Sequence, residues 1–408
     1  MSTPLTCTCV VAGGGPAGVM AGFLLARAGV DTIVLEKHAD FFRDFRGDTI
    51  HPSTLQVMAE LGLLDEFLKV PHDEVRYGEA EIGEEKFRVA DLSHLPTRCK
   101  FIAFMPQWDF LNFMAAQGKK LPRFRLMMDT EATDLVRQRN GQDDRFVGLT
   151  ANAPSGPIEI RADLVIGADG RHSRLRDAAG LEVDDIGAPM DVLWLRLERR
   201  PGEDHAVLGR FIDGRFFIML DRHDYWQCGL IIRKGTFDVV KNAGIAAFRT
   251  RVAQFAKRDN VDEIKSFDDV KLLTVAVDRL REWSRPGLLF IGDAAHAMSP
   301  IGGVGVNLAV QDAVAAANIL GEPLRRRAVT PADLHRVQKR RSFPTWATQT
   351  VQVTIQNRVI DPMLASGKTP KPPALLRLMQ HWPWLQRIPA RVLGLGFRPE
   401  HVRTSPAP

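Results

Sequence analysis

The stretch LLFIGDAAHAMSPIGGVGVNLAVQD, residues 288–312, combines a strand, a polar turn and a glycine-rich loop in a pattern typical of a ligand site. The apolar run 288–291 predicts a buried strand that delivers Gly292 and Asp293 to its carboxyl end. Ligands bind at that end of the strands in open α/β sheets. There Asp293 is placed to accept hydrogen bonds from a polyol.

A glycine-rich loop follows this strand and opens a helix. Gly302, Gly303 and Gly305 lack the side chains that would block a flat ring, and a helix is predicted from about Val306. The free N–H groups and the positive dipole end of this helix favour a negatively charged ligand. A reduced flavin carries negative charge along its N1–C2=O edge, so the loop and the helix predict a flavin site.

The N-terminal sequence predicts a site for the other half of a flavin dinucleotide. GGGPAG at 13–18 fits G-x-G-x-x-G. The flanking residues predict a strand over 8–12, a helix over 19–27 and a second strand over 31–35. Glu36 follows near the spacing at which a carboxylate meets a ribose hydroxyl. The predicted contacts are Gly13, Gly15, Pro16, Ala17, Gly18, Glu36 and Lys37.

A third motif lies between the other two in the sequence. DLVIGA at 163–168 predicts a buried strand, DGRHS at 169–173 follows it, and Arg174 and Arg176 begin a new helix. By itself DGRHS is also typical of an ordinary capped turn from a strand into a helix. Its place between two nucleotide motifs favours a role near the same cofactor.

With these three motifs in this order, the chain resembles the aromatic-ring hydroxylases of the single-component FAD-dependent monooxygenase family. The resemblance covers about residues 5–325. It implies that Glu36 binds the adenosine ribose, that Asp169 lies near the pyrophosphate, and that Asp293, next to Gly292, binds the ribityl chain. The implied cofactor is noncovalent FAD.

The same resemblance assigns residues at the reacting ring. Arg46 in FRGDTIHPSTL and Gln107 in MPQWDFLNFM match further FAD contacts, and Pro300 matches the residue whose carbonyl faces the ring-hydroxylation pocket. The amides of Val306 and Asn307, beside Gly305, match those at the flavin carbonyl edge. The implied catalytic set is Pro300, Gly303, Val306 and Asn307.

The resemblance and the sequence pattern predict an α/β fold with a Rossmann-like FAD-binding domain, an inserted α+β substrate domain on an antiparallel sheet, and a helical C-terminal tail. The substrate sheet is predicted from strand-like runs joined by Asp/Gly turns, covered by a helix over 237–256. The predicted boundaries are 1–75, 100–183 and 278–330 for the FAD domain, 76–99 and 184–277 for the substrate domain, and 331–408 for the tail. Within the FAD domain, apolar residues at helical spacing also predict a helix over 52–68.

The residue that activates the substrate is not identified by the resemblance. The active-site tyrosines of the family's best-known member, which hydroxylates 4-hydroxybenzoate, are not matched in a chain with only two tyrosines. Strand alternation puts half of the side chains on the wrong face for a substrate. His51 either faces the flavin or bonds the loop before a helix. The position of His296 after the GDAA turn favours a structural role over a proton relay. The candidate substrate contacts are Arg210, Tyr225, Gln227 and His51.

Composition predicts a cytoplasmic enzyme. The 408 residues carry a net charge of +5, which indicates anionic cofactors more than nucleic acid because no aromatic-studded basic stripe accompanies it. Four spread cysteines predict neither a disulfide framework nor a metal site. No signal peptide or membrane span is expected.

The C-terminal tail is predicted to be helical. The basic run 339–341 indicates a solvated helix face. Residues 373–394 place apolar side chains on one helical stripe, which favours packing on the nucleotide domain over contact with a membrane surface.

The predicted reaction is hydroxylation of an electron-rich aromatic or related small lipophilic ring, with O₂ and NADH or NADPH, through a flavin C4a-hydroperoxide. No second dinucleotide motif is present, so the nicotinamide is expected to dock transiently. One alternative is a flavin-dependent reductase of an isoprenoid or quinone-like substrate. Weaker alternatives are a halogenase, on a faint W-x-W-x-I-P echo at 382–389, and a non-enzymatic flavin-binding module.

Overall fold

The computed structural model describes residues 4–42, 49–140, 143–200, 208–222, 225–369 and 371–407. Its largest sheet has eight strands, and five of them run parallel in the order β20-β11-β1-β2-β8. The strands of this sheet are β1 Leu5–Ala12, β2 Thr32–Leu35, β8 Phe124–Met127, β9 Glu131–Asn140, β10 Asp143–Ala153, β11 Gly156–Gly167, β19 Ser284–Arg285 and β20 Leu288–Phe290.

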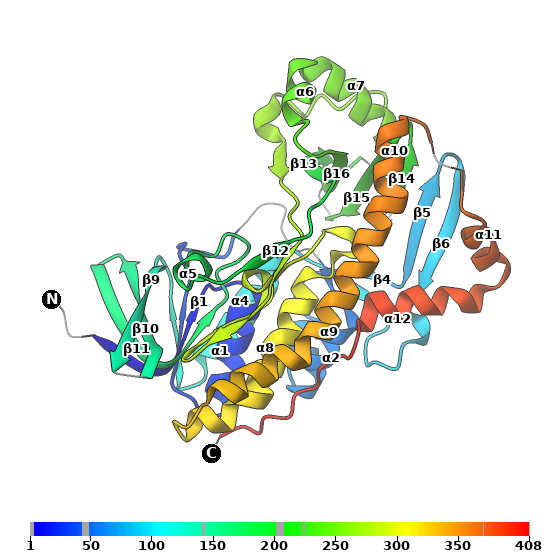
Figure 1. Ribbon diagram of the computed structural model, residues 1–408. Coiled ribbons are helices and arrows are strands. Elements are labelled where there is room, and N and C mark those ends of the chain that lie inside the picture. Colours follow the sequence, from blue (N-terminus) through cyan, green and yellow to red (C-terminus); the bar gives the residue numbers. More distant parts are fainter. Residues whose placement is uncertain are drawn as a thin grey trace.

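The central strands are buried because they are almost entirely apolar, and helices cover the sheet. In Figure 1, α1 (Pro16–Arg27) and the long α8 (Gly305–Arg325) lie against it, and they pack on each other in one core cluster. Among the described residues, Ile301–Arg325 alone is long and apolar enough to span a membrane, and 72% of its apolar window is buried inside the protein. α8 is therefore the central core helix.

A second sheet of seven strands has the order β17-β13-β16-β15-β14-β5-β6. All of its pairs are antiparallel except the parallel pair of β14 with β5. The segments 76–99 and 184–277 therefore contribute to the same sheet. Its strands are β5 Tyr77–Ile82, β6 Glu85–Asp91, β13 Met190–Glu198, β14 Leu208–Ile212, β15 Arg215–Asp221, β16 Tyr225–Arg233 and β17 Lys271–Leu273.

The two faces of this second sheet pack against different partners. Leu193 and Leu195 of β13 belong to a cluster with the helix Ile245–Ala256, whereas Val192 and Trp194 point to the other face. Figure 1 shows α6 and α7 over the first face and the orange helices of the tail beside the second. The second face is the one turned toward α9 and α10.

The predicted α/β class with its antiparallel insertion is confirmed, but three predicted helices are broken. The helix predicted over 52–68 ends at Glu60 and restarts at Leu64, because Gly62 has φ +73°. The helix predicted over 237–256 is interrupted at Gly244 (φ +86°). The tail stripe at 373–394 is two helices, separated by a 3₁₀ turn at Pro383–Gln386.

Two small sheets and several short helices complete the fold. The small strands are β3 Thr49–Ile50, β4 Asp73–Val75, β7 Ile102–Phe104, β12 Val183–Asp185, β18 Asp278–Leu280 and β21 His296–Ala297. The remaining helices are α2 Pro52–Glu60, α3 Leu64–Phe67, α4 Gln107–Lys119, α5 Arg174–Ala178, α6 Phe237–Asn242, α7 Ile245–Ala256, α9 Pro331–Ile355, α10 Asp361–Ser366, α11 Ala374–His381 and α12 Arg387–Leu395.

The tail packs on the rest of the protein along one side. α12 contacts α2, β6 and the 3₁₀ turn Leu92–His94, and α11 contacts β6. The other side of these helices is exposed, with Leu375, Trp384 and Ile388 each more than half accessible. The apolar stripe predicted to pack on the nucleotide domain is therefore not the packing side: Met379 is buried, but Leu375, Trp382 and Ile388 are exposed, and α11 packs on β6 of the second sheet. A membrane contact of the exposed side stays an untested alternative.

Candidate functional site

The carboxyl ends of the parallel strands bring all three sequence motifs to one edge. Ala12 at the end of β1 is level with Leu35 of β2 and with Gly167 of β11, and Gly167 is level with Phe290 of β20. The segments that follow these residues are the glycine loop, Glu36, the DGRHS turn and the Gly292 turn. Motifs 280 residues apart in sequence are therefore neighbours in space.

The glycines of the first loop have different steric reasons to lack a side chain. A Cβ at Gly13 would lie 2.3 Å from the Ala168 carbonyl oxygen, and one at Gly18 would lie 1.8 Å from the Gly13 carbonyl oxygen. These two positions therefore allow close packing of strand and helix. A Cβ at Gly15 would meet nothing within 4 Å, so Gly15 borders open space in front of α1.

This open space suits a pyrophosphate. Pro16 and Ala17 begin α1, whose N-cap residue is Gly15, so the first free N–H groups of the helix point into it. A dinucleotide phosphate needs such backbone donors and close approach to glycine. The loop therefore fits the ADP half of FAD.

The carboxylate of Glu36 is fixed next to the same loop. Its Oε2 accepts a hydrogen bond from the Gly14 amide (3.1 Å) and its Oε1 accepts one from the His38 amide (3.1 Å). The side chain is buried at the end of β2, as a ribose-binding carboxylate must be. Lys37, the next predicted contact, is exposed.

The DGRHS turn is held by its own polar groups. Asp169 accepts hydrogen bonds from Ser173 Oγ (2.6 Å) and the Leu175 amide (3.4 Å), and Ser173 caps α5. Burial raises the pKa of Asp169, and the hydrogen bond from Ser173 opposes this. Asp169 thus closes the turn, and this is the capped-turn alternative that the sequence left open.

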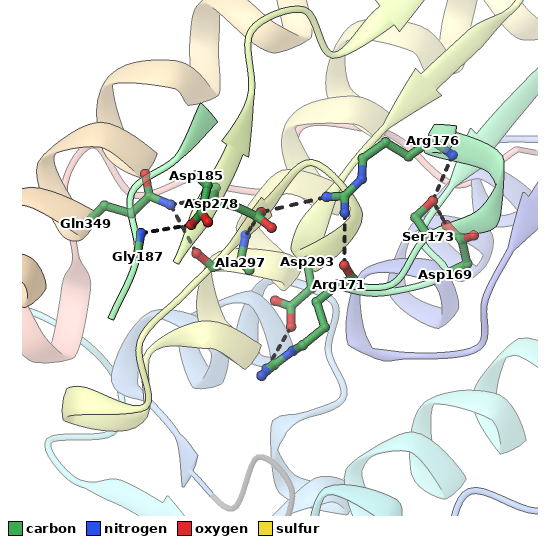
Figure 2. Close-up of polar contacts among 10 residues, drawn as sticks. All are labelled: Asp169, Arg171, Ser173, Arg176, Asp185, Gly187, Asp278, Asp293, Ala297 and Gln349. Carbon is green, nitrogen blue, oxygen red and sulfur yellow. Dashed lines mark hydrogen bonds and ion pairs between the residues drawn. The ribbon is translucent and has the colours of Figure 1, made fainter. Parts of the chain in front are cut away.

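The closed turn directs Arg171 toward Asp293. Figure 2 shows the Arg171 guanidinium reaching the Asp293 carboxylate, with Nη2 and Oδ2 3.2 Å apart. The Arg171 carbonyl in turn accepts a hydrogen bond from Arg176 (3.0 Å), which faces Asp278. Both members of the Arg171–Asp293 pair remain partly exposed, so each can exchange this contact for ribityl or phosphate oxygens.

Asn307 connects the start of α8 to the segment before α2. Its Oδ1 accepts hydrogen bonds from the His51 amide (2.8 Å) and Thr54 Oγ1 (2.7 Å), and its Nδ2 donates to the Thr49 carbonyl (3.2 Å). The Asn307 side chain is therefore used for structure. Its backbone amide and that of buried Val306 lie in the first turn of α8, where helix N–H groups are free for a ligand.

The sequence suggested one reason for the three glycines before α8, namely space for a flat ring. The structure shows different reasons at different positions. Gly302 (φ +76°) and Gly303 (φ +62°) both need positive φ, and a Cβ at Gly303 would lie 2.4 Å from Thr49 Oγ1. A Cβ at Gly305 meets nothing within 4 Å. Gly305 is thus the loop position whose missing side chain opens space in front of the helix.

His51 is buried between this loop and the tail. Its ring is fully buried, Nδ1 lies 2.7 Å from the Leu393 carbonyl oxygen of α12, and Nε2 has no partner among the described residues. Burial lowers the pKa of His51 from 6.5 to about 4, although the bond to Leu393 opposes this. A neutral imidazole that donates from Nδ1 leaves Nε2 as a free acceptor.

A buried ionic network behind the Gly292 turn was not identified from the sequence. Asp312 of α8 accepts hydrogen bonds from the Gly292 amide (3.1 Å) and Arg341 Nε (2.8 Å), and it lies 2.6 Å from His296 Nε2. Burial would raise the pKa of Asp312, but His296 and Arg341 lower it below its usual value. His296 therefore has the structural role that the sequence favoured.

Arg341 corrects one prediction. The run 339–341 was predicted to be a solvated face, but the Arg341 side chain is 1% exposed because it pairs with Asp312. Arg341 lies four residues before Thr345, which is also buried, so both are on the same face of α9. An interpretation based on charge alone overlooked this spacing.

Two glutamines of α9 hold the segment that contains Pro300. Gln352 Nε2 donates to the carbonyls of Ser299 (2.9 Å) and Ile301 (2.8 Å), on either side of Pro300. Gln349 Nε2 donates to the Ala297 carbonyl (3.0 Å). The segment carrying the predicted ring-facing carbonyl is therefore fixed from α9.

The candidate substrate contacts are divided between the two faces of the second sheet. Arg210 points to the α7 face, where it bonds Glu81 (3.2 Å) and the Phe255 carbonyl (2.7 Å). We therefore do not propose it as a substrate contact. Tyr225 and Gln227 lie on the opposite face of β16, which carries none of the residues that pack on α7.

Tyr225 and Gln227 already have partners in the protein. The Arg196 guanidinium lies over the Tyr225 ring at 4.0 Å from its centroid, and Gln227 Oε1 accepts a hydrogen bond from Arg222 (3.2 Å). Gln107 begins α4 and is half-buried. Arg46 lies outside the described residues.

No group of three or more metal-ligating side chains occurs within the described part of the chain. Cys7, Cys9, Cys99 and Cys228 form no disulfide and are buried, and burial raises the pKa of Cys7 to about 12. These thiols are inert packing groups rather than nucleophiles.

Comparison with known proteins agrees with this geometry. A family model described as an FAD binding domain matches residues 6–351. The chain belongs to this family. It is 33% identical over 373 residues to the 6-methylpretetramide 4-monooxygenase of Streptomyces rimosus, covering 89% of this chain and 85% of that protein.

More distant relatives have the same kind of activity in their names. The para-nitrophenol 4-monooxygenase of Pseudomonas sp. strain WBC-3 is 24% identical over 84% of each chain. The solved anhydrotetracycline hydroxylase from Streptomyces rimosus has the same fold, with a TM-score of 0.74 and 22% identity over 96% of this chain and 76% of that one. The protein is an FAD-dependent monooxygenase, and these relatives do not favour the reductase alternative.

Gly15→Ala and Gly18→Ala are expected to separate cofactor binding from folding. The added methyl at Gly15 enters open space, so the melting temperature of the flavin-free protein should not change while the Kd for FAD rises about tenfold or more. The methyl at Gly18 collides with backbone and should cost roughly 1–3 kcal/mol of stability. Thermal unfolding and flavin fluorescence measure the two effects. Equal losses of stability would contradict the assignment.

His51 should make stability depend on pH. Its pKa is lower in the folded protein, so the unfolded chain binds the proton first, and stability should fall as the pH drops from 6.5 toward about 4. Each pKa unit is worth about 1.4 kcal/mol. Urea unfolding of wild type and His51→Gln over this range isolates the contribution, since a glutamine cannot take up the proton. Parallel pH curves for the two proteins would refute the buried neutral imidazole.

Proposed function

We propose that this FAD monooxygenase hydroxylates one ring of a fused aromatic polyketide in the cytoplasm, with NADH or NADPH as the electron donor. The proposal rests mainly on the 33% identity to a monooxygenase named for 6-methylpretetramide, which extends over most of both chains. The proposed flavin site and an apolar sheet face both border the Pro300 segment, which supports this proposal.

The apolar side of the site supports a flat, lipophilic substrate. The face of the second sheet turned toward α9 carries Trp194, Phe216 and Ile218, which are only partly buried. Aromatic side chains that keep accessible surface inside a fold favour stacking with a ring. Ile301, directly after Pro300, belongs to the same apolar cluster as Trp194 and Phe216.

The protein contributes binding and positioning. The Gly15 loop and Glu36 would hold the ADP half of FAD, and Asp293, near Arg171, would hold its ribityl chain. The first turn of α8 would stabilise negative charge on the ring through its N–H groups. FAD, when bound, supplies the redox chemistry that passes electrons from the nicotinamide to O₂. The Pro300 segment, fixed by Gln349 and Gln352, keeps the substrate side of this space in shape.

We infer that the nicotinamide docks transiently, because the glycine motif at 13–18 is the one dinucleotide motif in the sequence and FAD uses it. The apolar side chains beside the Pro300 segment would exclude water from the proposed reaction site. No side chain of this chain is required to act as a nucleophile.

Incubation of the purified protein with 6-methylpretetramide, NADPH or NADH, and isotopically labelled dioxygen tests the proposal. We expect substrate-stimulated oxidation of the nicotinamide and one labelled oxygen atom in the product, because a monooxygenase inserts one atom of O₂. Mass spectrometry of the product gives the result. Nicotinamide oxidation that stays at the substrate-free rate, with no labelled product from this or related polyketides, would reject the proposed substrate class.

Gly305→Ala should uncouple the reaction. A methyl there enters the open space before α8, so the flavin ring and the substrate can no longer approach the helix together, whereas the distant ADP site is unaffected. Hydroxylated product should fall several-fold more than NAD(P)H oxidation, with the difference recovered as H₂O₂. Gly321→Ala in the same helix is the control, because its methyl would make ordinary contacts of 3.5 Å with Ala28. Unchanged coupling in Gly305→Ala would show that the ring lies elsewhere.

A further inference from the structure

Gln356 is a fully buried side chain whose polar atoms have no partner. Its exposure is 0%, and neither Oε1 nor Nε2 forms a hydrogen bond with another described residue. Burying an amide without hydrogen bonds costs free energy, so such groups in native proteins call for an explanation. Within the part of the chain that the structure describes, no residue forms a hydrogen bond with the Gln356 amide.

The neighbouring glutamines on the same helix face show what Gln356 lacks. Gln349 and Gln352 precede it by seven and four residues, the spacing of one helix face, and both donate to carbonyls of the segment around Pro300. Gln352 reaches Ile301, the last carbonyl bonded in this series. Gln356 lies one helical turn beyond Gln352, where no carbonyl of the segment 297–301 is bonded to it.

The helix changes its geometry at this residue. Gln356–Ile360 is a π-helical turn between α9 and α10. Such wide turns are rare and occur frequently at functional sites, because they place a side chain that a regular α-helix would direct elsewhere. Gln356 is therefore the residue at which the regular α-helical stripe ends and the wide turn begins.

The surroundings of the turn are the substrate side of the site. Ile355 and Ile360, on either side of Gln356, pack in the apolar cluster that contains Trp194 and Phe216 of the second sheet. Ile301, the neighbour of Pro300, belongs to the same cluster. In Figure 1 this part of the tail runs from the α8 region to the sheet of β13 to β16. The turn that carries the unpartnered amide is thus flanked by an apolar cluster that includes Ile301 and residues of the second sheet.

We propose that Gln356 is a substrate-binding residue that recognises a polar group with a donor and an acceptor side by side, as in a carboxamide. Its Nε2 donates to the ligand's oxygen and its Oε1 accepts from the ligand's N–H or O–H. The inference rests on the proposed function for the identity of the ring system. A single correctly oriented polar group in an apolar pocket fixes which ring carbon faces the flavin.

Gln356→Met tests this inference, with Gln352→Met as the matched control. Methionine keeps the length and removes the polar atoms at both positions. Without substrate, Gln356→Met should keep or raise the melting temperature because no hydrogen bond is lost. Gln352→Met should lower it because two buried carbonyls lose their donor. An equal fall in both variants would show that Gln356 has a structural partner and would overturn the inference.

The second measurement is binding of 6-methylpretetramide, followed by the flavin absorbance of the oxidised enzyme without nicotinamide. We expect Gln356→Met to raise the Kd about tenfold or more, since two neutral hydrogen bonds are lost, and to release more H₂O₂ per turnover. Gln356→Glu should bind as weakly, because it has no donor. Wild-type affinity in both variants would overturn the inference.

These measurements distinguish the two proposals. If wild type does not bind 6-methylpretetramide, the proposed substrate fails, and the comparison of melting temperatures then decides the role of Gln356. If wild type binds and hydroxylates the probe, and both Gln356 variants do so with the same efficiency, the proposed function stands and the inference about Gln356 fails.

Discussion

The carboxylate of Asp312 is the interaction on which the site depends. It lies on the central core helix, is completely buried, and is shared by the Gly292 turn, His296 and Arg341 of α9. A buried carboxylate is costly unless charge and hydrogen bonds compensate it, and the loss of one partner of a buried pair typically costs about 3–5 kcal/mol. The β20 turn, α8 and α9 are therefore tied to each other at one point.

Because Arg341 is bound at this point, the position of α9 relative to α8 and the Gly292 turn is fixed. Gln349 and Gln352 then meet the segment around Pro300, and the helix continues to the apolar face of the second sheet. The tail therefore borders the site that we propose for the reaction. α12 completes the arrangement, since the carbonyl of Leu393 holds the ring of His51 beside the start of α8.

The sequence predicted the features that depend on local spacing. The three motifs, the strand ends that carry them, Glu36 and the α8 N-terminus are each readable from a few consecutive residues, and parallel strands then bring them to one edge. The broken helices at Gly62 and Gly244 were missed because a glycine inside an apolar pattern is compatible with either continuation or a stop.

What the sequence could not predict depends on partners distant along the chain. Arg341 looks like any basic residue of a solvated helix until Asp312 is placed beside it, and Arg210 could not be assigned to the α7 face before the register of β14 was known. Gly303 was attributed to the flavin ring, although Thr49, more than 250 residues earlier, already excludes a side chain there. In each case tertiary contact outweighs local pattern.

Cofactor binding and substrate choice are assigned to different parts of the proposed site. The residues proposed to hold the cofactor lie in short motifs that tolerate little change, because the glycines, the carboxylate and the helix end each have one geometric task. The substrate side is made from strand faces and from α9, where a side chain can change without disturbing the motifs. Trp194, Phe216 and Gln356 all lie on that side. The oxidising power comes from the cofactor, so in our proposal these contacts select the ring and the ring position.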